Sequence, residues 1–191
     1  MARTREFDTD QAVERAMDLF WRRGYAATSM QDLIAELGIG SGSLYAAFGS
    51  KEKLYALALE RYCSRNAGAL IAHLESAEEV RPALRAALTA MAEADLCDPE
   101  RGCLMVNAAT ERASDPATAD RVAATMRLVE STLAGALERA RARGELAPDK
   151  DPVALARFLT TFIQGMRVMG KARADRAFFD GAVEAALTTL D

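Results

Sequence analysis

Apolar residues recur along most of this chain at the spacing of an amphipathic α-helix. Met30, Leu33, Ile34 and Leu37 are one example, because positions i, i+3, i+4 and i+7 fall on one face of a helix. No stretch of five or more residues alternates apolar and polar positions as a half-buried strand does. The pattern therefore predicts an all-α fold of about nine helices with no sheet.

Capping residues, glycines and prolines indicate where these helices begin and end. In the first third of the chain, helices are predicted over about 8–24, 28–38, 41–47 and 51–74. The remainder predicts helices over about 79–97, 103–112, 116–143, 152–170 and 175–190. Three helix starts are assigned to capping-box patterns: Asp8 with Gln11, Thr28 with Gln31, and Ser76 with Glu79.

Two short predicted helices, about 29–37 and 41–48, are joined by a turn that contains Gly38 and Gly40. This arrangement is typical of a helix-turn-helix, whose second helix places its N-terminal residues against base edges in the major groove of DNA. We therefore predict a three-helix DNA-binding domain over residues 1–66, with the helix-turn-helix at about 29–48, and a second helical domain over 67–191.

The overall charge argues against a nucleic-acid partner, because 24 basic and 28 acidic side chains give a net charge of −4. The local charge differs, since no acidic residue lies between Leu37 and Lys51. Within this stretch, the small residues Gly40 to Ser43 let backbone N–H groups approach phosphates at the positive end of a helix dipole. Thr28, Tyr45 and Lys51 offer phosphate donors around that helix start.

Many residues between Arg22 and Leu54 stand at the spacing of one known family. The matching positions are Gly24-Tyr25, Thr28-Ser29, Asp32-Leu33, Gly38-Ile39, Gly42-Ser43-Leu44-Tyr45, Phe48 and Ser50-Lys51-Glu52. With these residues the stretch resembles the DNA-binding domain of the TetR family of bacterial transcriptional repressors. The resemblance implies a homodimer, an operator of double-stranded DNA, and a C-terminal domain for dimerisation and a small-molecule effector. The sequence leaves open whether the regulator represses or activates.

The DNA-contact residues predicted from the helix-turn-helix and the resemblance are Thr28, Ser29, Ser41, Gly42, Ser43, Tyr45, Ala46, Ala47 and Lys51. Family members often carry a histidine or tyrosine at the position of Ala47, and a serine at that of Gly40. Ala47 contacts a thymine methyl at most, so we expect specificity to depend on DNA shape and phosphate register. Arg3 and Arg5 are expected to add phosphate or minor-groove contacts.

For the effector, we predict a pocket between the helices of the second domain, lined by apolar and adaptable side chains. Its predicted residues are Met91, Cys103, Asn107, Met126, Phe162 and Met166. Because they include few aromatics, we expect a lipophilic or amphipathic effector. The last two helices are expected to form a four-helix bundle with those of a second copy. The +4, +3 stripe of Leu155, Leu159, Phe162, Met166 and Met169 is compatible with such a bundle.

The three cysteines, Cys63, Cys97 and Cys103, lack the spacing of a zinc site or a disulfide framework, and we expect reduced thiols in a cytoplasmic protein. An alternative hypothesis makes Cys103 the sensor of oxidants or electrophiles, because it opens a predicted helix. We expect no metal, no cofactor, no membrane span and no enzymatic activity, since neither paired carboxylates nor a nucleophile-base motif is present.

Overall fold

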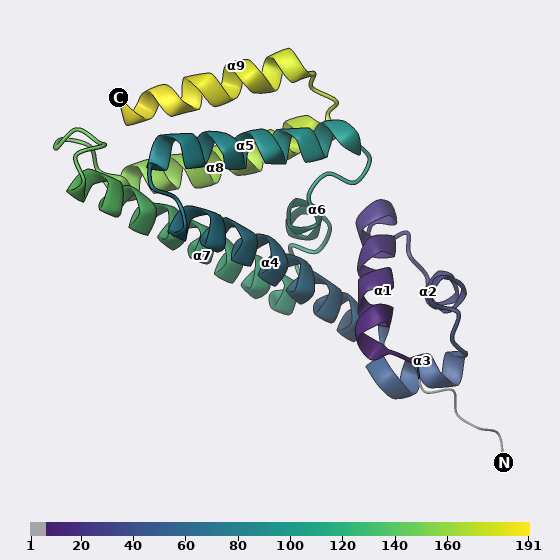
Figure 1. Cartoon of the computed structure of the whole chain (residues 1–191). Coiled ribbons are helices and arrows are strands. Elements are labelled where there is room, and N and C mark those ends of the chain that lie inside the picture. The colour runs from purple at the N-terminus through teal and green to yellow at the C-terminus, as the bar shows by residue number, and fades with distance from the viewer. Residues whose placement is uncertain (1–6) are drawn as a thin grey trace.

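The computed structural model describes residues 7–191, and Arg3 and Arg5 lie outside these described residues. Within this range the chain forms nine α-helices and one short 3-10 helix, with no strand, as the hydrophobic pattern predicted (Figure 1). The helices are α1 (Thr9–Arg23), α2 (Met30–Leu37), α3 (Ser41–Phe48), α4 (Lys51–Glu75), α5 (Val80–Cys97), α6 (Leu104–Glu111), α7 (Pro116–Ala142), α8 (Pro152–Lys171) and α9 (Arg176–Leu187). The 3-10 helix follows at Thr188–Leu190.

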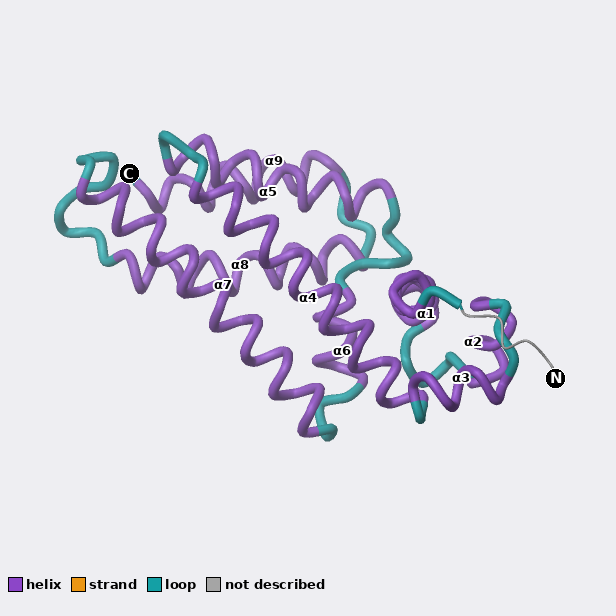
Figure 2. Tube along the Cα trace, turned by 60° about the horizontal axis from the view of Figure 1, so that its bottom comes forward, coloured by secondary structure: helices purple, strands orange, loops and turns teal. Residues whose placement is uncertain are grey.

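Helices α1, α2 and α3 cluster at one end of the molecule, and the long helix α4 leads from them along α7 to the opposite end (Figure 1). Helix α5 packs on α8 and α9, while α6 lies between α1 and this larger group (Figure 2). The predicted domain boundary at residue 66 falls inside α4, which runs through it without a break.

Two apolar cores are present, and their division does not follow the chain order. The first core contains residues of the four helices α1, α2, α3 and α4, together with residues of α6 that include Leu104 and Ala108. The second core holds α5, α7, α8, α9 and the C-terminal half of α4. Helix α6 therefore packs with the helix-turn-helix end, although it follows α5 in the chain.

Helix α3 is short and depends on tertiary packing, because a helix of eight residues is marginal alone. Leu44 and Phe48, one turn apart, are its buried residues, as their i, i+4 spacing predicted. Full burial of a leucine or phenylalanine contributes about 1.5–3 kcal/mol each. The other faces of α3 are thus left for contacts outside the chain.

Asp8 caps α1 as predicted, but the structure corrects the other two capping-box assignments. Ser29, not Thr28, caps α2: its hydroxyl accepts a hydrogen bond from the N–H of Asp32, whose carboxylate accepts from the N–H of Ser29 at 2.8 Å. The hydroxyl of Thr28 instead points inward and donates to the carbonyl oxygen of Gly24 at 2.7 Å.

At the start of α5 the predicted cap is replaced by a contact from far along the chain. Ser76 ends α4, and Glu79 precedes α5 without a capping hydrogen bond from its side chain. The N–H of Val80 is satisfied by the carboxylate of Glu145 at 2.7 Å. A long-range partner of this kind leaves no signal in the local sequence.

The apolar stripe predicted for α8 is not exposed on the surface, as the interface of a four-helix bundle with a second copy would require. Leu159 and Met166 are buried in the second core, and Leu155, Phe162 and Met169 pack against that core. The apolar side chains that α8 and α9 do expose are Val153, Phe158, Val168 and Phe178. Among the described residues, no helix is both long and apolar enough to serve as a membrane span.

Candidate nucleic-acid interface and effector cavity

The turn between α2 and α3 presents the N-terminus of α3 to solvent. Gly38 ends α2 in the left-handed region, with φ of 67°, a conformation that costs glycine little. Gly40 precedes α3 in an extended conformation, and among residues 7–191 no side chain caps the N–H groups of the first turn. Uncapped N–H groups at the positive end of a helix are suited to binding an anion such as a DNA phosphate.

Most of the predicted DNA-contact residues lie together on the outer side of α3. Those that are exposed are Ser41, Gly42, Tyr45, Ala46 and Ala47, and Ser43 is half-buried. Two residues of the α1–α2 connection are placed differently. Ser29 is exposed, but its hydroxyl is used in the α2 cap. Thr28 is fully buried, which removes its hydroxyl from this surface.

Lys51, the first residue of α4, packs on a tyrosine that the sequence analysis did not connect with it. Its ammonium nitrogen lies 4.1 Å from the ring centroid of Tyr25, and burial lowers the pKa of Lys51. The guanidinium of Arg112 also packs on the Tyr25 ring, with its central carbon 3.8 Å from the ring centroid. The hydroxyl of Tyr25 donates to Glu52 at 2.8 Å, so the lysine is held in place by a packed cluster.

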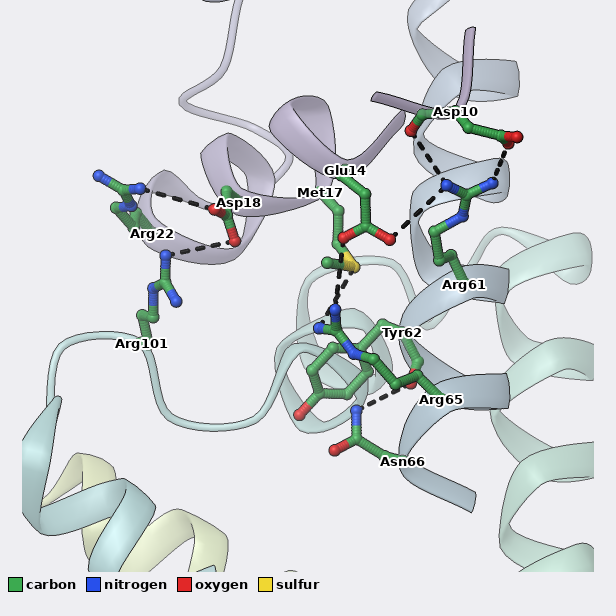
Figure 3. Close-up of polar contacts among 10 residues, drawn as sticks. All are labelled: Asp10, Glu14, Met17, Asp18, Arg22, Arg61, Tyr62, Arg65, Asn66 and Arg101. Carbon is green, nitrogen blue, oxygen red and sulfur yellow. Dashed lines mark hydrogen bonds and ion pairs between the residues drawn. The ribbon is translucent and has the colours of Figure 1, made fainter. Parts of the chain in front are cut away.

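The acidic side chains of α1 face arginines of α4 and of the loop before α6 (Figure 3). Arg61 pairs with Asp10 and Glu14, and Arg101 lies 3.3 Å from Asp18. Arg65 makes a further pair with Glu14 at 3.3 Å. The three acidic side chains of α1 are therefore paired with arginines of the same chain.

A cavity of about 540 Å³ lies between α4, α5, α7 and α8, with Trp21 of α1 at one side. This volume is in the range of small-molecule sites in proteins. Exposed residues of α4 and α5, among them Ala69 and Ala90, line it, which places its mouth between these two helices. A hollow of similar size near the α7–α8 loop is bounded by that loop and the C-terminus, far from the helix-turn-helix in sequence.

One wall of the cavity holds a buried charge pair. The carboxylate of Asp95 on α5 lies 3.1 Å from the guanidinium of Arg167 on α8, and the Asp95 side chain is 2% exposed. Burial raises the pKa of Asp95 to about 6, although Arg167 acts in the opposite direction. The charge pair is therefore held in a poorly solvated place that faces the cavity.

The sequence matches known families over most of its length. The family described as "Bacterial regulatory proteins, tetR family" matches residues 12–58, and that described as "Tetracyclin repressor-like, C-terminal domain" matches residues 76–186. The HTH-type transcriptional repressor ComR of Escherichia coli is 36% identical over 98% of this chain and 90% of its own length. This chain belongs to the tetR family of bacterial regulatory proteins.

Further relatives extend this result to the fold. The uncharacterized HTH-type transcriptional regulator YezE of Bacillus subtilis is 34% identical, with both chains fully covered. A cysteine mutant of the TetR family transcriptional regulator CifR, solved as a complex with 26bp double-strand operator DNA, is 34% identical and superposes with a TM-score of 0.88 over both whole chains. The reduced form of E. coli NemR shares 22% identity and has the same fold, with a TM-score of 0.85 over 96% of this chain and 98% of NemR.

The six effector residues predicted for this tetR-family protein are not brought together. Met91 and Cys103 line the cavity. Met166 is buried in the second core and Phe162 packs against it, while Met126 packs against the first core. Asn107 holds the loop before α6, because its amide donates to the carbonyl oxygen of Arg101 at 3.3 Å. None of these four lines the cavity.

The sequence analysis missed several polar residues of the cavity, among them Asp95, Gln164 and Arg167. A signal for one of them was present in the pattern. Asp95 continues the +4, +4, +3 series of buried positions Leu84, Leu88, Ala92 and Asp95 along α5, so a carboxylate occupies a place meant for an apolar side chain. A buried charge of this kind needs a partner, and it marks a functional site more often than an apolar residue does.

One backbone oxygen contacts both the charge pair of the cavity and helix α1. The carbonyl oxygen of Gly102 accepts from Nε1 of Trp21 on α1 at 3.0 Å and from Arg167 on α8 at 3.2 Å. A second link lies at the end of α6, where the carboxylate of Glu111 accepts from the N–H of Tyr25 at 2.8 Å. The segment 101–112 thus connects the charge pair of the cavity to the unit that carries α3.

Proposed function

We propose that this tetR-family protein is a ligand-responsive transcriptional repressor of the bacterial cytoplasm. Two copies bind a palindromic operator, and a small lipophilic or amphipathic effector releases them. The observation that carries the proposal is the outward face of α3, with uncapped N–H groups and an acid-free sequence around it. The names of two relatives support it: ComR is a transcriptional repressor, and CifR was solved on operator DNA.

Contact with DNA is proposed to begin at the start of α3. The N–H groups of Ser41 and Gly42 bind a phosphate, and the hydroxyl of Tyr45, which is 49% exposed, donates to another. Ala46 and Ala47 present only methyl groups to the bases. Sequence preference then comes from thymine methyl contacts and from the shape of the operator.

Release is proposed to start in the cavity. A ligand shifts the protein toward a second arrangement only if it binds that arrangement more tightly. Since α4 and Arg167 both line the cavity, a bound ligand acts on the long helix and on the hydrogen bond from Arg167 to Gly102. Movement of either changes the position of α1 and so the spacing of the two α3 helices in a dimer.

The proposed homodimer uses the outer faces of α8 and α9. Val153, Phe158 and Val168 on α8 and Phe178 on α9 are exposed by 42–51%. Several large apolar side chains exposed on adjacent helices are typical of a surface covered by a partner. A two-fold dimer buries the same patch of both copies and places two α3 helices in register with an inverted repeat.

A gel shift with the DNA upstream of the protein's own gene tests the repressor function. We expect a discrete complex that weakens steeply as salt is raised, because the contacts are mainly to phosphates. Tyr45→Ala should weaken it, whereas Ser131→Ala, an exposed change on α7, should not. No salt-sensitive complex with any palindrome in that region would count against the proposal.

A second candidate function is a thiol-based sensor that acts through Cys103. This residue lines the cavity and stands at the N-terminus of α6, and its sulfur accepts a hydrogen bond from the hydroxyl of Tyr62 at 3.4 Å. Modification of the thiol would place a new group between the cavity and the segment that reaches α1.

Release of DNA by oxidants or electrophiles separates the two candidates. A thiol sensor loses its response in Cys103→Ser and keeps it in Cys97→Ser, since Cys97 is an exposed thiol at the end of α5. If Cys103→Ser responds as the unmodified chain does, this second function is excluded.

A further inference from the structure

Two buried oxygen atoms in the cavity wall have no hydrogen-bond donor among residues 7–191. They are Oδ2 of Asp95 and Oε1 of Gln164, and both residues line the cavity. Buried polar groups in proteins are nearly always hydrogen-bonded, because an unmet group has lost its water without replacement. The wall formed by α5 and α8 therefore has two acceptors to offer to a ligand.

The other buried polar atoms without a partner do not change this balance. Thr160, whose hydroxyl is unpaired, does not line the cavity. Arg101 also lines the cavity, and its Nε, which has no hydrogen-bond partner among residues 7–191, lies 3.4 Å from a carboxylate oxygen of Asp98, so its charge is opposed by a neighbour. The acceptors of the cavity wall that still lack a donor are those of Asp95 and Gln164.

Charge balance decides which kind of donor fits. The other oxygen of Asp95 already faces Arg167, and this guanidinium also donates to the carbonyl oxygens of Met91 and Gly102. The pair is neutral as it stands, so a bound cation would leave a net charge in a poorly solvated place. A bound anion would face the free carboxylate oxygen. A neutral donor meets the two acceptors and leaves the charge balance unchanged.

The remainder of the lining is suited to an apolar body. Alanines of α4 and α5, together with Leu70 and Ile163, cover much of the wall. The volume of about 540 Å³ holds a chain of eight to ten carbons with room to spare. A ligand of this shape lies with its polar end toward Asp95 and its apolar body along the alanines.

We propose that the effector is a neutral, lipophilic molecule that carries a hydrogen-bond donor, of the class of alcohols and primary amides, and that its donor binds Asp95 and Gln164. This inference rests on the proposed function, since it names the chemistry of the ligand in the same cavity. Burial raises the pKa of Asp95 to about 6, so at pH 7.5 its carboxylate is ionised and accepts a hydrogen bond from the ligand.

Calorimetric titration of the full chain with two isomers tests the proposal. 1-Octanol and 1-methoxyheptane have the same atoms and similar length, but only the alcohol has a donor. At pH 7.5 we expect the alcohol to bind about tenfold more tightly, the effect of one hydrogen bond to a buried acceptor. Octanoate and octylammonium, which bring a charge, should bind more weakly than the alcohol.

Three variants connect the preference to the residues. Gln164→Leu removes one acceptor at similar volume and should bring the ratio of the two affinities toward one, and Asp95→Asn should do the same. Thr125→Val is the matched control, because Thr125 lines the cavity but its hydroxyl already donates to the backbone carbonyl oxygen of Arg121 at 2.9 Å. Thermal unfolding checks that Asp95→Asn is folded, and Gln164→Leu keeps the test valid if it is not.

The outcomes separate this inference from the proposed function. Equal affinities for the two isomers, no binding of the alcohol up to its solubility, or an unchanged preference in Gln164→Leu would overturn the proposal, even if the chain binds its operator. Failure to bind DNA would instead overturn the repressor function, while the titration of the free protein would still report the ligand preference.

Discussion

At the scale of single residues, Asp95 is a carboxylic acid whose protonation depends on the fold. Burial raises the pKa of its carboxyl from the ordinary value of 3.8 to about 6, and Arg167 on α8 opposes this rise. The folded chain therefore holds this proton more tightly than the unfolded chain. The resulting stability is fully present below about pH 4 and is lost as the pH rises through about 6.

This linkage predicts how the free energy of unfolding varies with pH. Between pH 4.5 and 7 the contribution of Asp95 should fall, and Asp95→Asn should remove that part of the profile. Asp98→Asn controls for the change in net charge at an exposed position. Denaturant titrations at several pH values measure the effect, and identical pH profiles for Asp95→Asn and the unmodified chain would contradict it.

A glycine at the end of α1 sets the closest approach between α6 and the helix-turn-helix end. Gly24 has φ of 82°, and a Cβ there would lie 2.5 Å from a carboxylate oxygen of Glu111. We expect Gly24→Ala to lower the free energy of unfolding by about 1–2 kcal/mol, from backbone strain and the displaced carboxylate.

The matched control for this change is another glycine of the chain. Gly68 lies within α4 with open space where a Cβ would go, and Gly68→Ala should raise the free energy of unfolding by about 0.5–1 kcal/mol. Chemical denaturation of both variants measures the two changes. Equal effects of the same sign would show that Gly24 has no special role.

At the scale of the element, the residues of α3 that stabilise the fold and those proposed to bind DNA lie on different faces of the helix. Tyr45 is 49% exposed, whereas its neighbour Leu44 is fully buried. We expect Tyr45→Ala to weaken operator binding about tenfold or more without loss of stability, because it removes a phosphate donor and little packing. Leu44→Ala should lower the free energy of unfolding by about 2–5 kcal/mol. Fluorescence anisotropy and denaturation measure the two quantities, and a stability loss in Tyr45→Ala would contradict this division.

The elements themselves were largely predictable because their signals are local. Helix α8 was predicted over about 152–170 and is observed at Pro152–Lys171, since an aspartate followed by proline marks its start. The start of α2 was misassigned by one residue, because both Thr28 and Ser29 could cap it. Only the packing of the Thr28 side chain against the α1 turn decides between them.

The cavity could not be predicted in the same way. Nothing in the sequence distinguishes Met126 and Met166 from Met91 as candidate pocket residues. Of these three methionines, only Met91 lines the cavity. Which residues face a cavity depends on how each helix is rotated about its axis relative to its neighbours. The contacts of Trp21 and Arg167 with Gly102 join residues more than 60 positions apart and leave no local pattern.

At the scale of the whole molecule, the account requires two copies. Phe158 and Val168 are exposed on α8, and we expect Phe158→Glu to convert the dimer into a monomer by placing a charge in an apolar interface. Leu57→Glu changes an exposed apolar residue of α4 and should leave the dimer intact. Light scattering after size-exclusion chromatography measures the mass. A dimer of unchanged stability in Phe158→Glu would place the interface elsewhere.

The central claim is that two α3 helices read one inverted repeat. Selection of the full chain on a random library of double-stranded DNA tests it most directly, because the result depends on no assumed operator. We predict enrichment of a palindrome whose half-sites face the same side of the duplex, bound by two chains and lost in Tyr45→Ala. Enrichment of a single half-site, or of no sequence at all, would contradict the account.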